Sequence, residues 1–334
     1  MASGSKKKGK MSISEFKREV AATALNHEPG LLDRALIALH LKTPEAKQHS
    51  PEYYRHLQKA IDEQRAPIGA VLASTRHRAP KAAGNKRITT GIEGLDQLFA
   101  NGMPEGSSVL ICGGAGSGKT IMALQILNNM LSRGRQCVYI SLEESEERLE
   151  QHMRDFNFDV DGHKEKDLLH IRRIDPFKLA RLVEAMLANA KGELMFDFIE
   201  ESLLLDQVKP SVVFLDSITA LESAFEGKDT EYRIYIEQLF RYFERIGATS
   251  FLISETDQMP VKYSKTGVEE FLADGVLVLY HIQSGETRTR AIEILKMRGA
   301  KYREKLSYME IVEKKGIRVL PDAELFMGES EMKK

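Results

Sequence analysis

The sequence contains no tryptophan and only two cysteines, Cys112 and Cys137, among its 334 residues. Both cysteines lie in apolar stretches, so we expect buried thiols in a reducing compartment rather than a disulfide framework. No apolar run approaches the roughly 18–20 residues of a membrane-spanning helix, and no signal peptide is visible. These absences predict a cytoplasmic protein that makes no contact with a membrane.

The sequence also has little net charge, because 48 basic residues nearly balance 49 acidic ones. The balance is uneven along the chain. Residues 1–87 hold 17 Lys and Arg against 8 Asp and Glu, whereas the remaining residues hold 31 against 41. A basic N-terminal part suggests an acidic partner, nucleic acid or protein, although solubilising charge on a small domain explains it equally well.

The N-terminal residues differ in pattern from the rest of the chain. Residues 1–11 are rich in Lys, Gly and Ser and predict a disordered basic tail. Residues 12–80 hold three short amphipathic patterns, the third starting at a Ser-Pro-Glu helix signal, and predict a small helical domain. Residues 81–87 are predicted to be a linker. Nothing in the helical domain carries chemistry, so recruitment of a protein partner is the role we consider for it.

Residues 88–334 alternate between strand and helix patterns. Strands are predicted at 108–112, 136–142, 211–215, 249–254, 275–282, 289–296 and 307–313, and helices at about 119–132, 145–155, 176–190, 195–206 and 230–245. Helices separate the first four strands, which predicts an α/β fold with a mainly parallel central sheet covered on both faces. The last strands follow one another closely and predict an antiparallel hairpin at an edge.

The stretch from Gly113 to Thr120 fits the phosphate-loop (Walker A) pattern G-x-x-x-x-G-K-[ST]. It follows an apolar strand and opens an amphipathic helix, which is the context that the pattern requires. Glycines let the backbone turn N–H groups toward phosphate oxygens, and the helix N-terminus adds partial positive charge. A glycine-rich turn between a strand and a helix is the alternative. The residues predicted to contact ATP are Gly113, Gly114, Ala115, Gly116, Ser117, Gly118, Lys119, Thr120 and Ile121.

A magnesium site is predicted from two of these stretches together. Thr120 supplies a hydroxyl at the start of the helix, and the apolar run 212–216 ends in Asp216. In phosphate-loop proteins such a strand carries the Asp that holds Mg²⁺ with the loop hydroxyl. An Asp at the end of a buried strand is common by itself, but here it lies in the same α/β pattern as the loop.

Candidates for activating water follow the strand at 136–142. Glu143 and Glu144 would lie at the carboxyl edge of the sheet, where ligands bind. Hydrolysis needs a group that orients or deprotonates water, and Glu143 suits this role. The alternative is that these glutamates are N-terminal charges of the next helix, an interpretation that fits Glu146 and Glu147 better.

Two cations near the C-terminal end of the sheet could stabilise charge on a transferred phosphoryl group. Lys296 and Arg298 are two residues apart, so on a strand they would point to one face. Ordinary edge-strand charges are the alternative.

These stretches resemble the KaiC family within the RecA superfamily of ATPases, in order and spacing, from about Ile88 to the C-terminus. The resemblance rests on seven stretches, which are 90–96 (TGIEGLD), 102–106 (GMPEG), the phosphate loop, 141–144 (SLEE), 214–217 (FLDS), 267–274 (GVEEFLAD) and 294–299 (ILKMRG). It implies a ring, usually a hexamer, that binds ATP at each subunit interface. It also implies Glu143 and Glu144 as the catalytic glutamates, and Lys296 and Arg298 as groups that reach the neighbouring subunit's γ-phosphate.

The chain also departs from the family pattern. The clock proteins of the family carry two such domains in tandem, whereas this chain has one, preceded by an unfamiliar helical segment. The autokinase half of the clock protein has a Ser-Thr acceptor pair where this chain has Glu270 and Phe271, which argues against self-phosphorylation there. Many members have Ser/Thr-His after Lys-Met-Arg-Gly, where this chain has Ala300-Lys301-Tyr302. The contribution of that His to nucleotide binding is therefore not carried over.

Three functions are compatible with these observations. The first is a slow, ring-forming, Mg²⁺-dependent ATPase that acts as a regulatory or signalling switch. The second is a DNA-dependent recombinase or motor, which the basic residues 1–87 favour and the acidic remainder disfavours. The segment 217–230 holds one Lys and three acidic residues, so it does not suggest a DNA-contacting loop. The third is a scaffold that holds ATP structurally and recruits a partner through the N-terminal helices.

Overall fold

The computed structural model describes residues 86–323, apart from 190–195, 204, 206–207, 259, 261–262, 265 and 285–286. The predicted basic tail and helical domain, residues 1–80, lie outside the described residues, as does most of the predicted linker. The end of that linker, Arg87, forms β1 (Arg87–Ile88), which pairs with β2 (Met103–Pro104) in a small antiparallel sheet.

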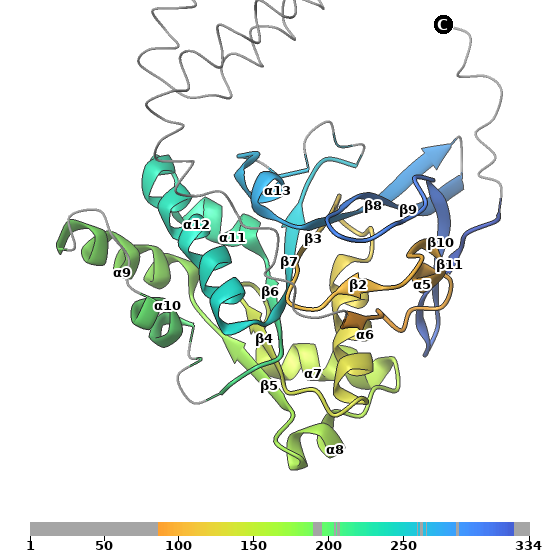
Figure 1. The fold of residues 1–334 in the computed structure, drawn as a ribbon, viewed down its shortest axis with the longest axis horizontal. Helices are drawn as coiled ribbons and strands as arrows, with labels where there is room; N and C mark the ends of the chain where they lie inside the picture. Colours follow the sequence, from red (N-terminus) through yellow and green to blue (C-terminus); the bar gives the residue numbers. More distant parts are fainter. Residues whose placement is uncertain are drawn as a thin grey trace, which may run out of the picture. The chain divides into compact units, whose positions relative to one another are not determined.

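A nine-stranded sheet forms the centre of the described residues (Figure 1). In chain order its strands are β3 (Ser108–Gly113), β4 (Cys137–Ser141), β5 (Leu169–Arg173), β6 (Val212–Asp216), β7 (Thr249–Glu255), β8 (Gly275–Ser284), β9 (Thr287–Met297), β10 (Ser307–Val312) and β11 (Gly316–Leu320). In space they follow the order β11-β10-β9-β8-β3-β7-β6-β4-β5. Strand β3, which precedes the phosphate loop, therefore lies in the middle of the sheet.

The six strands from β8 to β5 are parallel to one another, and β9, β10 and β11 are antiparallel to their neighbours. This confirms the mainly parallel sheet with an antiparallel end. The hairpin of β8 and β9 was expected at an edge of the sheet. It lies inside the sheet instead, because β8 pairs in parallel with β3 and β10 pairs with β9. Parallel pairing brings the carboxyl ends of β3, β4, β6 and β7 to one edge, where ligands bind in such sheets.

Helices cover both faces of the sheet. Packed on one face are α6 (Lys119–Leu131), α7 (Glu146–Asp155) and α8 (Val160–Glu165), joined by the short α5 (Leu95–Leu98). Packed on the other are α9 (Pro176–Asn189), α10 (Phe196–Ser202), α11 (Ile218–Ala224), α12 (Asp229–Ile246) and α13 (Val268–Leu272). The helix expected over 195–206 ends at Ser202. Within the described residues, none of these helices is both long and apolar enough to cross a bilayer.

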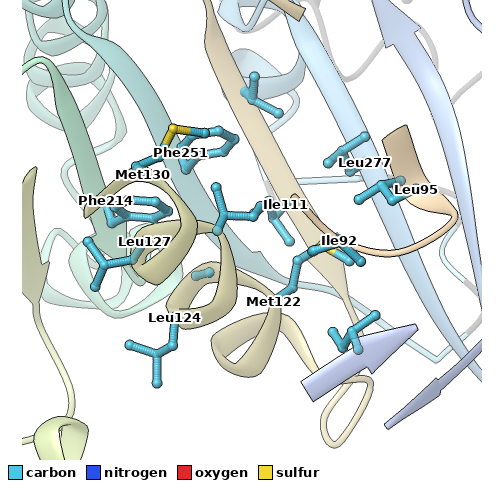
Figure 2. Close-up of a cluster of buried hydrophobic side chains, with 14 of the residues drawn as sticks. Ile92, Leu95, Ile111, Met122, Leu124, Leu127, Met130, Phe214, Phe251 and Leu277 are labelled. Carbon is cyan, nitrogen blue, oxygen red and sulfur yellow. The ribbon is translucent and has the colours of Figure 1, made fainter. Parts of the chain in front are cut away.

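Side chains alternate between the two faces along each buried strand, as strand geometry requires. In β3, Val109 and Ile111 pack toward α6, whereas Leu110 and Cys112 pack toward α11 and α12. Under α6 the rings of Phe214 and Phe251 stack with centroids 5.0 Å apart, and Figure 2 shows Leu127 and Met130 of α6 close to them. This packing anchors α6 to β6 and β7.

Candidate active site

The phosphate loop lies between the end of β3 and the start of α6. Gly116 and Gly118 have φ values of 73° and 106°, in the left-handed region that glycine adopts without strain. The loop is closed by a hydrogen bond that the Ser117 N–H donates to Gly114 O, at 3.2 Å. The Ser117 hydroxyl is buried and has no hydrogen-bond partner among the described residues. A concave glycine loop at a helix N-terminus, with an unpaired buried hydroxyl, fits a phosphate group.

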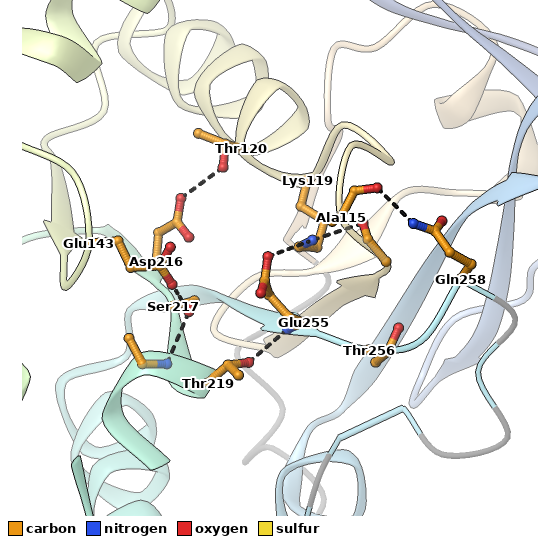
Figure 3. A network of polar contacts seen from close by, with 12 residues as sticks. Ala115, Lys119, Thr120, Glu143, Asp216, Ser217, Thr219, Glu255, Thr256 and Gln258 are labelled. Atoms are coloured by element: carbon orange, nitrogen blue, oxygen red, sulfur yellow. Dashed lines mark hydrogen bonds and ion pairs between the residues drawn. The ribbon is translucent and has the colours of Figure 1, made fainter. Parts of the chain in front are cut away.

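The loop lysine is buried and points back into the protein. Lys119 is 7% exposed, and its Nζ donates to Gly114 O at 3.1 Å and contacts Glu255 Oε1 at 3.5 Å. Glu255 is the last residue of β7 and is half-exposed. Figure 3 shows this carboxylate facing the lysine across the loop. Glu255 was not predicted from the sequence, although it ends an apolar strand as Asp216 does.

The predicted pair Thr120 and Asp216 is brought together. The Thr120 hydroxyl donates to Asp216 Oδ2 at 3.1 Å, and the Tyr139 hydroxyl donates to the same oxygen at 2.6 Å. Burial raises the pKa of Asp216 to about 6, with the carboxylates of Glu143 and Glu144 acting in the same direction and the hydrogen bonds from Tyr139 and Thr120 acting against it. A hydroxyl beside a carboxylate is a set of hard oxygen donors, which fits Mg²⁺.

The two adjacent glutamates point in different directions. Glu143 accepts a hydrogen bond from the Ser217 hydroxyl, directly after Asp216 (Figure 3). Glu144 instead contacts Arg148 of α7 at 3.1 Å and His152 at 3.7 Å. Glu143 is therefore hydrogen-bonded to the residue that follows β6, whereas Glu144 is paired along α7. The Ser145 hydroxyl caps α7, with Glu146 and Glu147 in its first turn, as the alternative interpretation predicts for those two residues.

The predicted cations Lys296 and Arg298 lie together, but apart from their own phosphate loop. Lys296 Nζ donates to Glu270 O at 2.9 Å, and Arg298 Nη2 donates to Phe271 O at 3.1 Å. Arg298 also pairs with Asp274 at 3.5 Å. Both cations thus contact α13 or the residues that follow it, Lys296 from the end of β9 and Arg298 from the turn directly after that strand. Burial, followed by the charge of Arg298, lowers the pKa of Lys296 to about 8.

Gln258 and Arg290 donate hydrogen bonds to backbone carbonyls of the phosphate loop. Neither residue belongs to a sequence motif that would have predicted this contact. Gln258 donates from Nε2 to Ala115 O at 3.0 Å (Figure 3). Arg290 of β9 donates from Nε to Gly116 O at 3.3 Å. At the other end of the loop, Ile121 packs partly buried against the core of the α6 face. The loop is therefore anchored by the segment after β7 and by β9.

Comparison with known proteins identifies the family of this fold and site. The family described as "ATPase: KaiC" matches residues 88–324. The circadian clock protein KaiC3 of Synechocystis is 30% identical over 238 residues, which are 71% of this chain and 46% of that protein. The chain thus spans less than half the length of that clock relative.

Single-domain relatives match over nearly their whole length. The UPF0273 protein PH0284 of Pyrococcus horikoshii is 30% identical over 248 residues, which are 73% of this chain and 97% of that protein. The crystal structure of the KaiC-like protein PH0186 from Pyrococcus horikoshii has a TM-score of 0.57 and 27% identity, and the match covers 71% of this chain and 99% of that one. Together with the phosphate loop in its α/β setting, these matches mean that the chain belongs to the KaiC family of ATPases.

Proposed function

We propose that this protein binds ATP with Mg²⁺ at the phosphate loop and hydrolyses it, as a switch in regulation or signalling. The observation that carries the proposal is the gathering of three chemical groups at one edge of the sheet. These are the buried ammonium of Lys119, the oxygen pair of Thr120 and Asp216, and the carboxylate of Glu143. Membership of an ATPase family agrees with this chemistry.

Each group has a role that follows from its position. Backbone N–H groups from Gly113 to Thr120 would bind the phosphate oxygens, and Lys119 would exchange its contacts with Gly114 and Glu255 for the β- and γ-phosphates. Thr120 and Asp216 would hold Mg²⁺, which neutralises charge on the phosphates when bound. Glu143, oriented by the Ser217 hydroxyl, would accept a proton from the attacking water.

We further propose a homo-oligomeric ring, of six subunits as in the family, in which Lys296 and Arg298 act on a neighbour's nucleotide. The support is that both side chains contact α13 rather than the phosphate loop of their own chain. Their positive charge would stabilise the developing charge on the transferred phosphoryl group. Mass in solution, with and without ATP, tests the ring.

Turnover measurements test hydrolysis. Lys119→Ala and Glu143→Gln should each lower ATP turnover at least 100-fold, because one removes phosphate binding and the other the proton acceptor. Glu146→Gln is the matched control, since it neutralises a nearby glutamate in the first turn of α7. Wild-type turnover in both Lys119→Ala and Glu143→Gln would refute the proposed mechanism.

A mixing experiment tests action in trans. Lys119→Ala subunits retain the cations, and a Lys296→Ala/Arg298→Ala double variant retains the phosphate loop. Each should be inactive alone, and a mixture should regain turnover where an intact loop meets intact cations. Lys301→Ala, an exposed cation nearby, should be active alone. An inactive mixture that nevertheless forms mixed rings would contradict the arrangement.

The proposal also covers the location and the partner of the protein. Both cysteines are free and buried, which agrees with a reducing cytoplasmic location. Residues 12–80, the predicted helical domain, are proposed to bind a protein partner. DNA-dependent ATP hydrolysis is the alternative function. It would be favoured if DNA stimulated ATP hydrolysis and if this stimulation decreased steeply as the salt concentration rises. Glu270 and Phe271 offer no hydroxyl, so self-phosphorylation is not proposed there.

A further inference from the structure

One tyrosine in the core ends at the proposed metal site. Tyr139 is the central residue of β4 and is fully buried. Its ring stacks on Phe214 of β6, with centroids 5.7 Å apart and an interplanar angle of 15°, and Phe214 stacks in turn on Phe251. These three rings form a row across β4, β6 and β7 under α6. Tyr139 alone in this row carries a hydroxyl, and that hydroxyl reaches Asp216.

The strand register explains why the reach is possible. Tyr139 lies opposite Phe214, and Ser141 lies opposite Asp216. Residues two apart on a strand share a face, so Tyr139, Phe214 and Asp216 all point to the α6 side. The length of the tyrosine ring spans the step of two residues and brings its oxygen to 2.6 Å from Asp216 Oδ2.

The hydroxyl restricts how the carboxylate can turn. Oδ2 of Asp216 accepts from both Tyr139 and Thr120, whereas Oδ1 accepts no hydrogen bond among the described residues. The Tyr139 hydroxyl donates its single proton to Oδ2 from a fully buried position. The carboxylate is therefore fixed with one oxygen turned inward and the other left for a ligand.

We infer that Tyr139 is a positioning residue for the divalent cation, orienting Asp216 so that it can bind Mg²⁺ together with Thr120. This inference rests on the proposed function, since it assumes a metal–nucleotide site at the loop. Groups that orient a metal ligand commonly contribute 10- to 100-fold to metal affinity. A tyrosine that served only to fill the core would contribute to stability and leave metal affinity unchanged.

Tyr139→Phe separates these roles, because it keeps the stacked ring and removes only the oxygen. The matched control is Tyr235→Phe, which removes another fully buried hydroxyl from α12, on the opposite face of the sheet. Two constants are measured on the full-length protein. One is the affinity for a fluorescent ADP analogue in EDTA, and the other is the affinity of the ADP complex for Mn²⁺, by electron paramagnetic resonance of free Mn²⁺.

The expected result is a split between the two constants. Tyr139→Phe should bind Mn²⁺ about 10-fold more weakly or worse, with metal-free ADP affinity within about twofold of wild type, and Tyr235→Phe should match wild type in both. Mn²⁺ affinity in Tyr139→Phe within twofold of wild type would overturn the role of Tyr139 and leave the metal–nucleotide site standing. Absence of Mn²⁺ binding to the wild-type ADP complex would overturn both. Tenfold weaker Mn²⁺ binding by Tyr139→Phe, in a protein whose wild type hydrolyses no ATP, would remove the proposed hydrolysis and keep the role of Tyr139.

Discussion

The ion pair between Lys119 and Glu255 should oppose nucleotide binding. Lys119 must leave the Glu255 carboxylate before it can contact phosphates, and that carboxylate then remains near the bound anion. Glu255→Gln keeps the shape of the side chain and removes its charge. We therefore expect this variant to bind nucleotide more tightly than the wild type does.

The size of the effect follows from the distance and the exposure of the two groups. At 3.5 Å the Coulomb energy is about 1 kcal/mol in water and about 5 kcal/mol at an effective dielectric constant of ~20. The Glu255 side chain is 50% exposed, so solvent screening brings the net value near the exposed-pair range, about 1 kcal/mol or less. This corresponds to roughly fivefold tighter ADP binding. The gain should be larger for ATP, because its γ-phosphate adds charge that Glu255 repels.

Equilibrium titration with fluorescent ADP and a non-hydrolysable ATP analogue is the suitable assay, because it does not depend on turnover. Asp257→Asn is the control, since it removes an exposed carboxylate two residues away. Raising the salt concentration should narrow the difference between wild type and Glu255→Gln. Unchanged or weaker binding by Glu255→Gln would refute the reasoning and would indicate that Glu255 contacts the bound nucleotide or its cation favourably.

Three other predictions concern stability and pH. Phe214→Ala should lower the free energy of unfolding by about 3–5 kcal/mol, since it removes the middle of the stacked row, and a urea midpoint close to that of wild type would contradict this. Glu269→Gln should cost about 1.5–3 kcal/mol in urea denaturation, because the buried Glu269 carboxylate accepts from Tyr232 and from Thr266 at 2.6 Å, whereas the exposed Glu226→Gln should be neutral. The pKa of Lys296 is lowered to about 8 in the folded protein, against about 10.4 in the unfolded chain. Between these pH values the unfolded chain binds more protons, so the free energy of unfolding should increase as pH rises from about 8 to about 10.4. Lys296→Met should lack that gain when unfolding is compared at pH 7.5 and 9.5, and an identical pH dependence in both proteins would contradict the shift.

The phosphate loop, its flanking strand and helix, and the pairing of Thr120 with Asp216 were predictable because their signals are local. A glycine pattern, an apolar run and a helical period each depend on a few consecutive residues. The order of strands across the sheet had no such signal. Strand β5 was also missed, because five residues with His170 and Arg172 between apolar ones resemble a loop, and α11 and α13 are too short to show a helical period.

The site residues that the sequence analysis missed owe their positions to contacts between distant segments. Tyr139 is an ordinary apolar position in β4 until the register places it beside Asp216. Glu255 and Gln258 reach the loop only because β7 adjoins β3. The different directions of the Glu143 and Glu144 side chains could not be predicted either. Both residues follow the end of β4, where neither strand nor helix periodicity sets the direction of a side chain. The helical domain over residues 12–80 stays a prediction.

Among the described residues, β5 is the last strand on its side of the sheet, and no described strand pairs with its outer backbone groups. An unpaired edge strand can form backbone hydrogen bonds with a strand of another molecule, which is a common route to aggregation. His170, Arg172 and Arg173 place bulky basic groups along this margin, and a second copy brought alongside would present the same groups. The basic side chains of β5 thus disfavour the pairing of two copies of this chain along that edge.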